Sequence, residues 1–162
     1  MGSLASLVII AHVFVPQSWA LKAIMSKLTL DYSEQRRFSP MTYWVHRGVN
    51  ESDTYYEHWS AFEPPLPNKD PLKGYPYLIV SVLGFHIEFS SSNEMEHFIE
   101  VMEQKNLPTT ISLSKQRGSQ NGPNSHWLSR FPAHLKKWEK REKLVLAVKK
   151  AKESAEVSGN GF

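Results

Sequence analysis

The chain has 162 residues, 41% of them hydrophobic and 12% aromatic, which is typical of one folded domain and argues against a disordered chain. It contains no cysteine, which excludes disulfide frameworks, thiolate metal sites, iron–sulfur clusters and thiol nucleophiles. The net charge of +3 is unevenly spread: residues 1–110 carry 8 basic and 12 acidic side chains, whereas residues 111–162 carry 11 and 4. The C-terminal third is therefore expected to attract anionic partners.

The first 24 residues form an apolar leader or an upstream extension. The run from Leu4 to Val15 is shorter than the roughly 20 residues that a membrane-spanning helix needs, so we predict no integral membrane span. Its length suits a signal peptide with Ser18 and Ala20 before the cleavage site, but no basic residue precedes it. If translation starts at Met25, the first 24 residues are an upstream extension. A buried N-terminal helix or strand is the third alternative. We predict a cytoplasmic protein, or an exported one if the run is a signal peptide.

Two β-hairpins are expected in the first half of the domain. Residues 41–47 have the aromatic and β-branched character of a short strand, and residues 53–62 are its candidate partner. Residues 63–71 contain four prolines, which exclude a helix and indicate an extended connection. Residues 77–89 alternate apolar and polar side chains around Leu83-Gly84, which predicts two strands joined by a tight turn.

Helices are predicted for the second half. Ser91 and Glu94 form a capping-box pattern before a helix over residues 92–105, and a short helix is expected over residues 109–117. Pro132 suits the first turn of a long, basic, amphipathic helix over residues 133–155. We therefore predict an α+β fold in which a small antiparallel sheet is covered by a helix. A single domain over residues 25–155 is expected, followed by a frayed tail over residues 156–162.

The basic C-terminal region is the main candidate binding site. Lysine and arginine on one helix face neutralise phosphates, and binding of this kind is salt-sensitive and largely independent of nucleotide sequence. We predict a non-enzymatic binding or accessory protein that contacts nucleic acid or an acidic protein surface, without cofactor or metal. A merely solvated helix face and a membrane or calmodulin-like surface are the alternatives. The candidate residues are Lys115, Arg117, Asn124, His126, Arg130, Lys136, Lys137, Lys140, Arg141 and Lys143.

Two other functions remain open at this stage. A small enzyme acting on phosphodiesters would use His126 with Arg130, four residues apart and expected on one helix face, or His46 with His58. The alternative for the first pair is structural, with Asn124 and Ser125 capping a helix while Trp127 and Leu128 enter the core. A protein–protein interaction module would instead use the apolar stripe of the terminal helix, which comprises Leu135, Trp138, Val145, Val148 and Ala151 or Lys152, with Leu144 beside it.

A resemblance concerns roughly residues 77–150. It rests on four short segments that precede a basic helix containing tryptophan, namely Asn106 to Thr110, Arg117-Gly118, Gly122 to Arg130 and Pro132-Ala133. Together they resemble a family of short, uncharacterised proteobacterial proteins, often found near mobile elements. The resemblance implies no activity and assigns no catalytic residue. The N-terminal quarter departs from that pattern.

Overall fold

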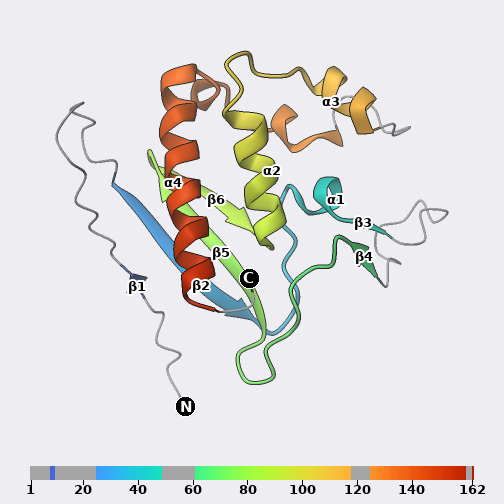
Figure 1. The fold of residues 1–162 in the computed structure, drawn as a ribbon, viewed down its shortest axis with the longest axis vertical. Coiled ribbons are helices and arrows are strands. Elements are labelled where there is room, and N and C mark those ends of the chain that lie inside the picture. Colours follow the sequence, from blue (N-terminus) through green and yellow to red (C-terminus); the bar gives the residue numbers. More distant parts are fainter. Residues whose placement is uncertain (1–7, 10–24, 49–60, 118–124, 160–161) are drawn as a thin grey trace.

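The computed structural model describes residues 8–9, 25–48, 61–117, 125–159 and 162, and it shows an α+β protein. Its main sheet is antiparallel and has the strand order β1 (Val8–Ile9), β2 (Ser26–Ser33), β5 (Tyr75–Val82), β6 (Phe85–Phe89). Figure 1 shows β2, β5 and β6 side by side, with β1 at the outer edge of β2. The predicted fold class is confirmed.

The hairpin between β5 and β6 turns at the predicted dipeptide. Val82 lies opposite Phe85, so only Leu83 and Gly84 connect the strands. Both have positive φ, 53° and 73°, as a two-residue type I′ turn requires. Glycine adopts this conformation without steric cost, which explains its place in the turn.

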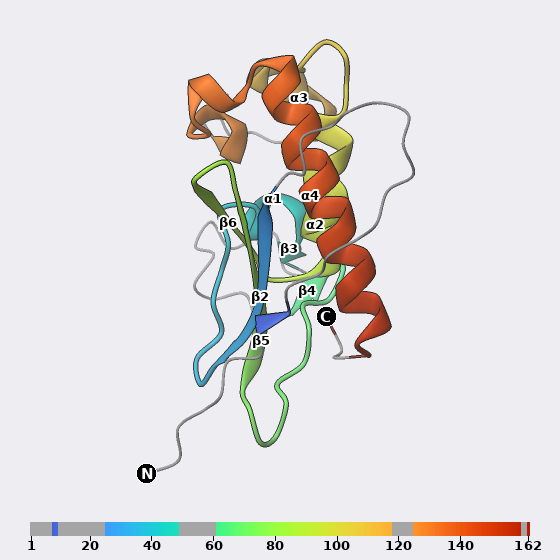
Figure 2. The same cartoon turned by 90° about the vertical axis from the view of Figure 1, so that its left-hand side faces the viewer.

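Helices α2 (Ser92–Met102) and α4 (Trp138–Val157) cover one face of the sheet (Figure 2). The inward side chains of β5 and β6, such as Leu78 and Phe89, are fully buried against Phe98 of α2 and Val148 of α4. Because every second strand residue points to this face, the alternation read from the sequence also marks the core.

The hydroxyl of Ser91 caps α2, as predicted, by accepting the Glu94 N–H at 3.2 Å. The Glu94 carboxylate does not return to the Ser91 N–H as a capping box requires, and accepts the Ser90 N–H at 2.7 Å instead. The helix ends at Met102 rather than near Lys105, because the carbonyls of Met102, Gln104 and Lys105 turn toward another helix.

Strand β2 was not predicted from the sequence. Leu28 and Leu30 lie opposite Val80 and Leu78 of β5 and pack against the core, while Thr29 lies on the other face. The signal was the alternation of leucine with polar residues from Leu28 onward, which is that of a half-buried strand.

The predicted early hairpin is wrong in its first strand. Residues Thr42–Val45 form the short helix α1, and only β3 (Arg47–Gly48) pairs with β4 (Phe62–Glu63). The cause is tertiary: the Thr42 hydroxyl is fully buried and donates to the Glu94 carboxylate at 2.6 Å, which overrides the strand propensity of the segment. Most of the expected partner, residues 53–60, lies outside the described residues.

The C-terminal region begins differently from the prediction. Helix α3 (Thr110–Arg117) forms as expected. The single helix predicted from residue 133 consists of a short 3-10 helix, η4 (Ala133–Leu135), an extended residue at Lys137, and then α4. Helix α4 continues through Val157, beyond the predicted start of a frayed tail.

Candidate functional site

Helix α4 has two flanks that use their cations differently. One flank faces α2, where the ammonium of Lys149 lies 2.8 Å from the carboxylate of Glu103, and that of Lys152 lies 2.8 Å from Glu96. Lys152 also pairs with Glu156 at 3.2 Å. These two lysines therefore hold the helices together and are engaged within the molecule.

The opposite flank carries Lys140, Lys143 and Lys150, which we call the basic flank. Successive residues of an α-helix are rotated by about 100°, so Lys143 and Lys150 lie only about 60° and 80° around the helix axis from Lys140. The three lysines therefore project from one side of the helix. All three are partly exposed, and none forms an ion pair with another described residue. Three positive charges thus remain available to an external anion.

Arg141 is a predicted binding residue that the structure assigns to the core. Only 3% of it is exposed, and its guanidinium donates to four backbone carbonyls. The distances are 2.9 Å to Lys136, 2.9 Å to Met102, 2.6 Å to Gln104 and 3.1 Å to Lys105. Since its donors satisfy these carbonyls, Arg141 joins the end of α2 to the start of α4 and is unavailable to a partner.

His126 is also buried, so His126 and Arg130 do not form the joint phosphate-binding pair that their spacing suggested. His126 is 0% exposed and precedes the 3-10 helix η3 (Trp127–Ser129), whereas Arg130 is exposed on the other side of that turn. The His126 ring packs against Trp127 with the centroids 5.1 Å apart, and both Trp127 and Leu128 are buried. The structural alternative for this segment is confirmed for the core residues, and the side chain of His126 caps η3.

The hydrogen bonds of His126 fix its tautomer. Its Nδ1 accepts the Leu128 N–H at 3.0 Å, so the proton of the neutral ring is on Nε2. That Nε2 lies 3.3 Å from Nε2 of His97, which must then accept and carry its own proton on Nδ1. Burial lowers the pKa of His97 to about 4 and, together with the neighbouring His97, that of His126 to about 3. The two rings form a neutral donor–acceptor pair at pH 7.

His97 lines a cleft of about 400 Å³ between α1, α2 and α3. Arg117, a predicted site residue, lies on its wall: its guanidinium donates to the Tyr43 carbonyl at 2.8 Å and stacks 4.7 Å from the Trp44 ring centroid. Arg47 of β3 contributes a second guanidinium to the same cleft. The sequence analysis did not identify this cleft, because its walls come from segments far apart in the chain.

The remaining predicted residues are dispersed. Lys115 is exposed on α3, Lys136 is partly exposed, and Lys137 is exposed immediately before α4. Asn124 lies outside the described residues. Of the proposed interface stripe, Leu135, Leu144, Val145, Val148 and Ala151 are buried within the protein, and only Trp138, 41% exposed, faces solvent. Most of the stripe is therefore packed in the core of the protein.

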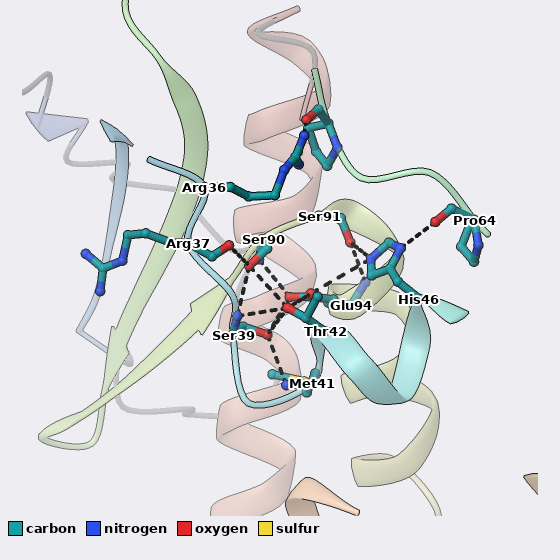
Figure 3. A network of polar contacts seen from close by, with 11 residues as sticks. Arg36, Arg37, Ser39, Met41, Thr42, His46, Pro64, Ser90, Ser91 and Glu94 are labelled. Carbon is teal, nitrogen blue, oxygen red and sulfur yellow. Dashed lines mark hydrogen bonds and ion pairs between the residues drawn. The ribbon is translucent and has the colours of Figure 1, made fainter. Parts of the chain in front are cut away.

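A buried polar network surrounds Glu94 (Figure 3). Its carboxylate accepts hydrogen bonds from the hydroxyls of Ser39 and Thr42, each at 2.6 Å, and from the Ser90 N–H. Ser39 N–H in turn donates to the Thr42 hydroxyl at 2.8 Å and to that of Ser90 at 3.0 Å. Burial raises the pKa of Glu94. The network joins the segment before α1 to the start of α2.

His46 belongs to the same region and is fully buried. Its Nδ1 lies 2.6 Å from the Pro64 carbonyl, which can only accept, so Nδ1 carries the proton and Nε2 accepts the Ser91 hydroxyl at 2.7 Å. Burial lowers the pKa of His46 and keeps the ring neutral, so its 3.8 Å approach to Glu94 is not an ion pair. His58, its proposed partner, lies outside the described residues.

In the described part of the chain, no group of three or more histidine, aspartate or glutamate side chains is arranged to hold a metal ion. No described helix combines the length and apolar character needed to cross a membrane. Comparisons of the chain with protein-family models, curated proteins and solved structures found no match.

Proposed function

We propose that this protein is a non-enzymatic binding module that contacts the phosphate backbone of nucleic acid through the basic flank of α4. The observation that carries the proposal is the contrast on one helix: Lys149 and Lys152 are paired with glutamates, whereas Lys140, Lys143 and Lys150 form no ion pair with a described residue. Lys136 and Lys137 extend the same positive charge beyond the start of the helix.

The arrangement suits a linear polyanion. From Lys140 to Lys150 the helix rises about 15 Å, so the three ammonium groups can meet successive phosphates along one backbone. Lysine neutralises phosphate as a point charge and reads no base, so the contact positions a nucleic acid without selecting a sequence. An enzymatic function receives less support from the geometry, because His126 and His46 are fully buried and their ring nitrogens are engaged in hydrogen bonds.

A filter-binding titration tests the proposal, with duplex DNA, single-stranded RNA and poly-glutamate as probes at low and at physiological salt. The variant K140Q/K143Q/K150Q removes the basic flank, and K149Q/K152Q is the control on the same helix. We expect nucleic acid to bind at low salt, the triple variant to bind at least tenfold more weakly, and the control to bind within about twofold of the original protein.

Two results would overturn the proposal. One is an equal loss of affinity in both variants, which would assign the effect to net charge rather than to the basic flank. The other is binding to poly-glutamate without binding to DNA or RNA, which cation–phosphate contact does not explain. The melting temperature of each variant, measured first, confirms that the compared proteins are folded.

A further inference from the structure

A second site is suggested by the cleft between α1, α2 and α3. Its volume of about 400 Å³ lies within the range of roughly 300–1,000 Å³ that small-molecule sites occupy. The lysines of the basic flank do not line it, and Lys152, on the other flank of α4, reaches a glutamate on its wall. The cleft is therefore separate from the proposed phosphate contact.

Two guanidinium groups form the positive side of this cleft. Arg117 is held in place by the Tyr43 carbonyl and by the ring of Trp44. Arg47 is exposed, and its guanidinium makes a long hydrogen bond of 3.4 Å to the Arg117 carbonyl. Since Arg47 forms no ion pair with a described residue, its charge can take a ligand carboxylate.

Helix α2 forms the opposite side. Asn93, Glu96, His97 and Glu100 line the cleft from positions i, i+3, i+4 and i+7, which share one helix face. Glu96 is neutralised by Lys152, but Glu100 forms no ion pair with a described residue. An available carboxylate therefore faces the same cleft as the available guanidinium of Arg47.

From this pairing of charges we infer that the cleft binds a small zwitterion, namely a free α-amino acid or a short peptide. Arg47 holds its carboxylate, and Glu100 holds its ammonium group. A simple anion leaves Glu100 unmatched, and a simple cation leaves Arg47 unmatched, so a ligand that carries both charges is complementary to the site.

Neutral polar groups complete the site. The amides of Asn93 and Gln116 line the cleft and can both donate and accept hydrogen bonds. His97 is neutral at pH 7 because burial lowers its pKa, so it adds a hydrogen-bonding ring without a third positive charge. Among the described residues that line the cleft, the arginines and glutamates are thus the charged ones at pH 7.

The test is a titration of the isotope-labelled full chain, followed through the side-chain amide signals of Asn93 and Gln116. The ligands are the common amino acids and short peptides in the millimolar range, each matched by its N-acetyl derivative, which lacks the ammonium group, and its amide, which lacks the carboxylate. We expect the zwitterions to shift these signals and both single-charge analogues to bind at least tenfold more weakly. Whether free amino acids or only peptides bind identifies the source of the ligand.

Variants provide the second arm. R47Q and E100Q change exposed side chains without ion pairs to described residues, so both are expected to fold and to bind the zwitterion about tenfold more weakly or worse. E103Q, at the residue that follows α2 and outside the cleft, should bind normally. The inference is overturned if no zwitterion shifts the signals, if the single-charge analogues bind equally well, or if R47Q and E100Q both bind normally. None of these results bears on nucleic-acid binding, which involves other residues.

Discussion

The two flanks of α4 carry the same kind of side chain and use it in opposite ways. On the flank facing α2, Lys149 and Lys152 pair with glutamates, and Arg141 at the start of the helix donates to carbonyls of a neighbouring segment. On the basic flank, Lys140, Lys143 and Lys150 have no such partner among the described residues. The positive charge of the C-terminal third is therefore partly structural, and only the remainder is available for binding.

The largest effect on stability is expected from Arg141→Met. This substitution removes the donors to four backbone carbonyls where the end of α2 meets the start of α4. Because unsatisfied buried acceptors are costly, we predict a loss of about 3 kcal/mol in the free energy of unfolding. Urea denaturation measures it. Lys140→Met is the matched control and should change the free energy by less than about 0.5 kcal/mol; equal effects of the two substitutions would remove the distinction between the flanks.

A pH-dependent effect of intermediate size is expected from His97. Its pKa falls from 6.5 in the unfolded chain to about 4 in the folded one, so between these values the unfolded chain binds more protons. The contribution of this group to stability is therefore complete above about pH 6.5 and is lost as the pH falls toward 4. We predict that His97 contributes a loss of about 3 kcal/mol in the free energy of unfolding over this range, so the pH dependence should be weaker in His97→Gln and unchanged in K140Q/K143Q/K150Q.

Thermal denaturation monitored at several pH values between 7 and 4 gives this comparison. A His97→Gln protein with the same pH dependence as the original would show that the neutral His97–His126 pair does not contribute to it. The triple variant, which changes only the lysines of the basic flank, serves as a control for net charge.

The smallest effect on stability is expected from K149Q/K152Q. The ion pairs to Glu103 and Glu96 are partly exposed to solvent, so their removal should cost only about 0.5 kcal/mol at low salt and less at high salt. Chemical denaturation at two salt concentrations measures the difference. A loss that is unchanged by salt would mean that the lysine side chains act through packing and not through charge.

The local patterns of the sequence predicted the hairpin of β5 and β6, its turn and the capped start of α2, because neighbouring residues determine these features. They failed where distant residues decide. Buried Glu94 holds Thr42 and favours the helix α1, and Arg141 ends α2 early by taking its carbonyls. Nothing near Arg141 in the sequence distinguishes it from Lys140, so its burial could not be predicted from composition or spacing.

Like the fold, the candidate site could be predicted from the sequence only in part. Of the predicted binding residues, Lys140 and Lys143 are partly exposed, whereas His126 and Arg141 are buried. The cleft combines Arg47 with residues of α2 and α3, and no spacing in the chain reveals such a combination.

The salt dependence of nucleic-acid affinity tests the central claim most directly. Each lysine–phosphate contact contributes about 0.7 to 0.9 to the slope of log K against log salt concentration. The slope for K140Q/K143Q/K150Q should therefore be shallower than that of the original protein by about 2 to 3, while that for K149Q/K152Q should be unchanged. Identical slopes for the original protein and the triple variant would contradict the assignment of phosphate contacts to the basic flank.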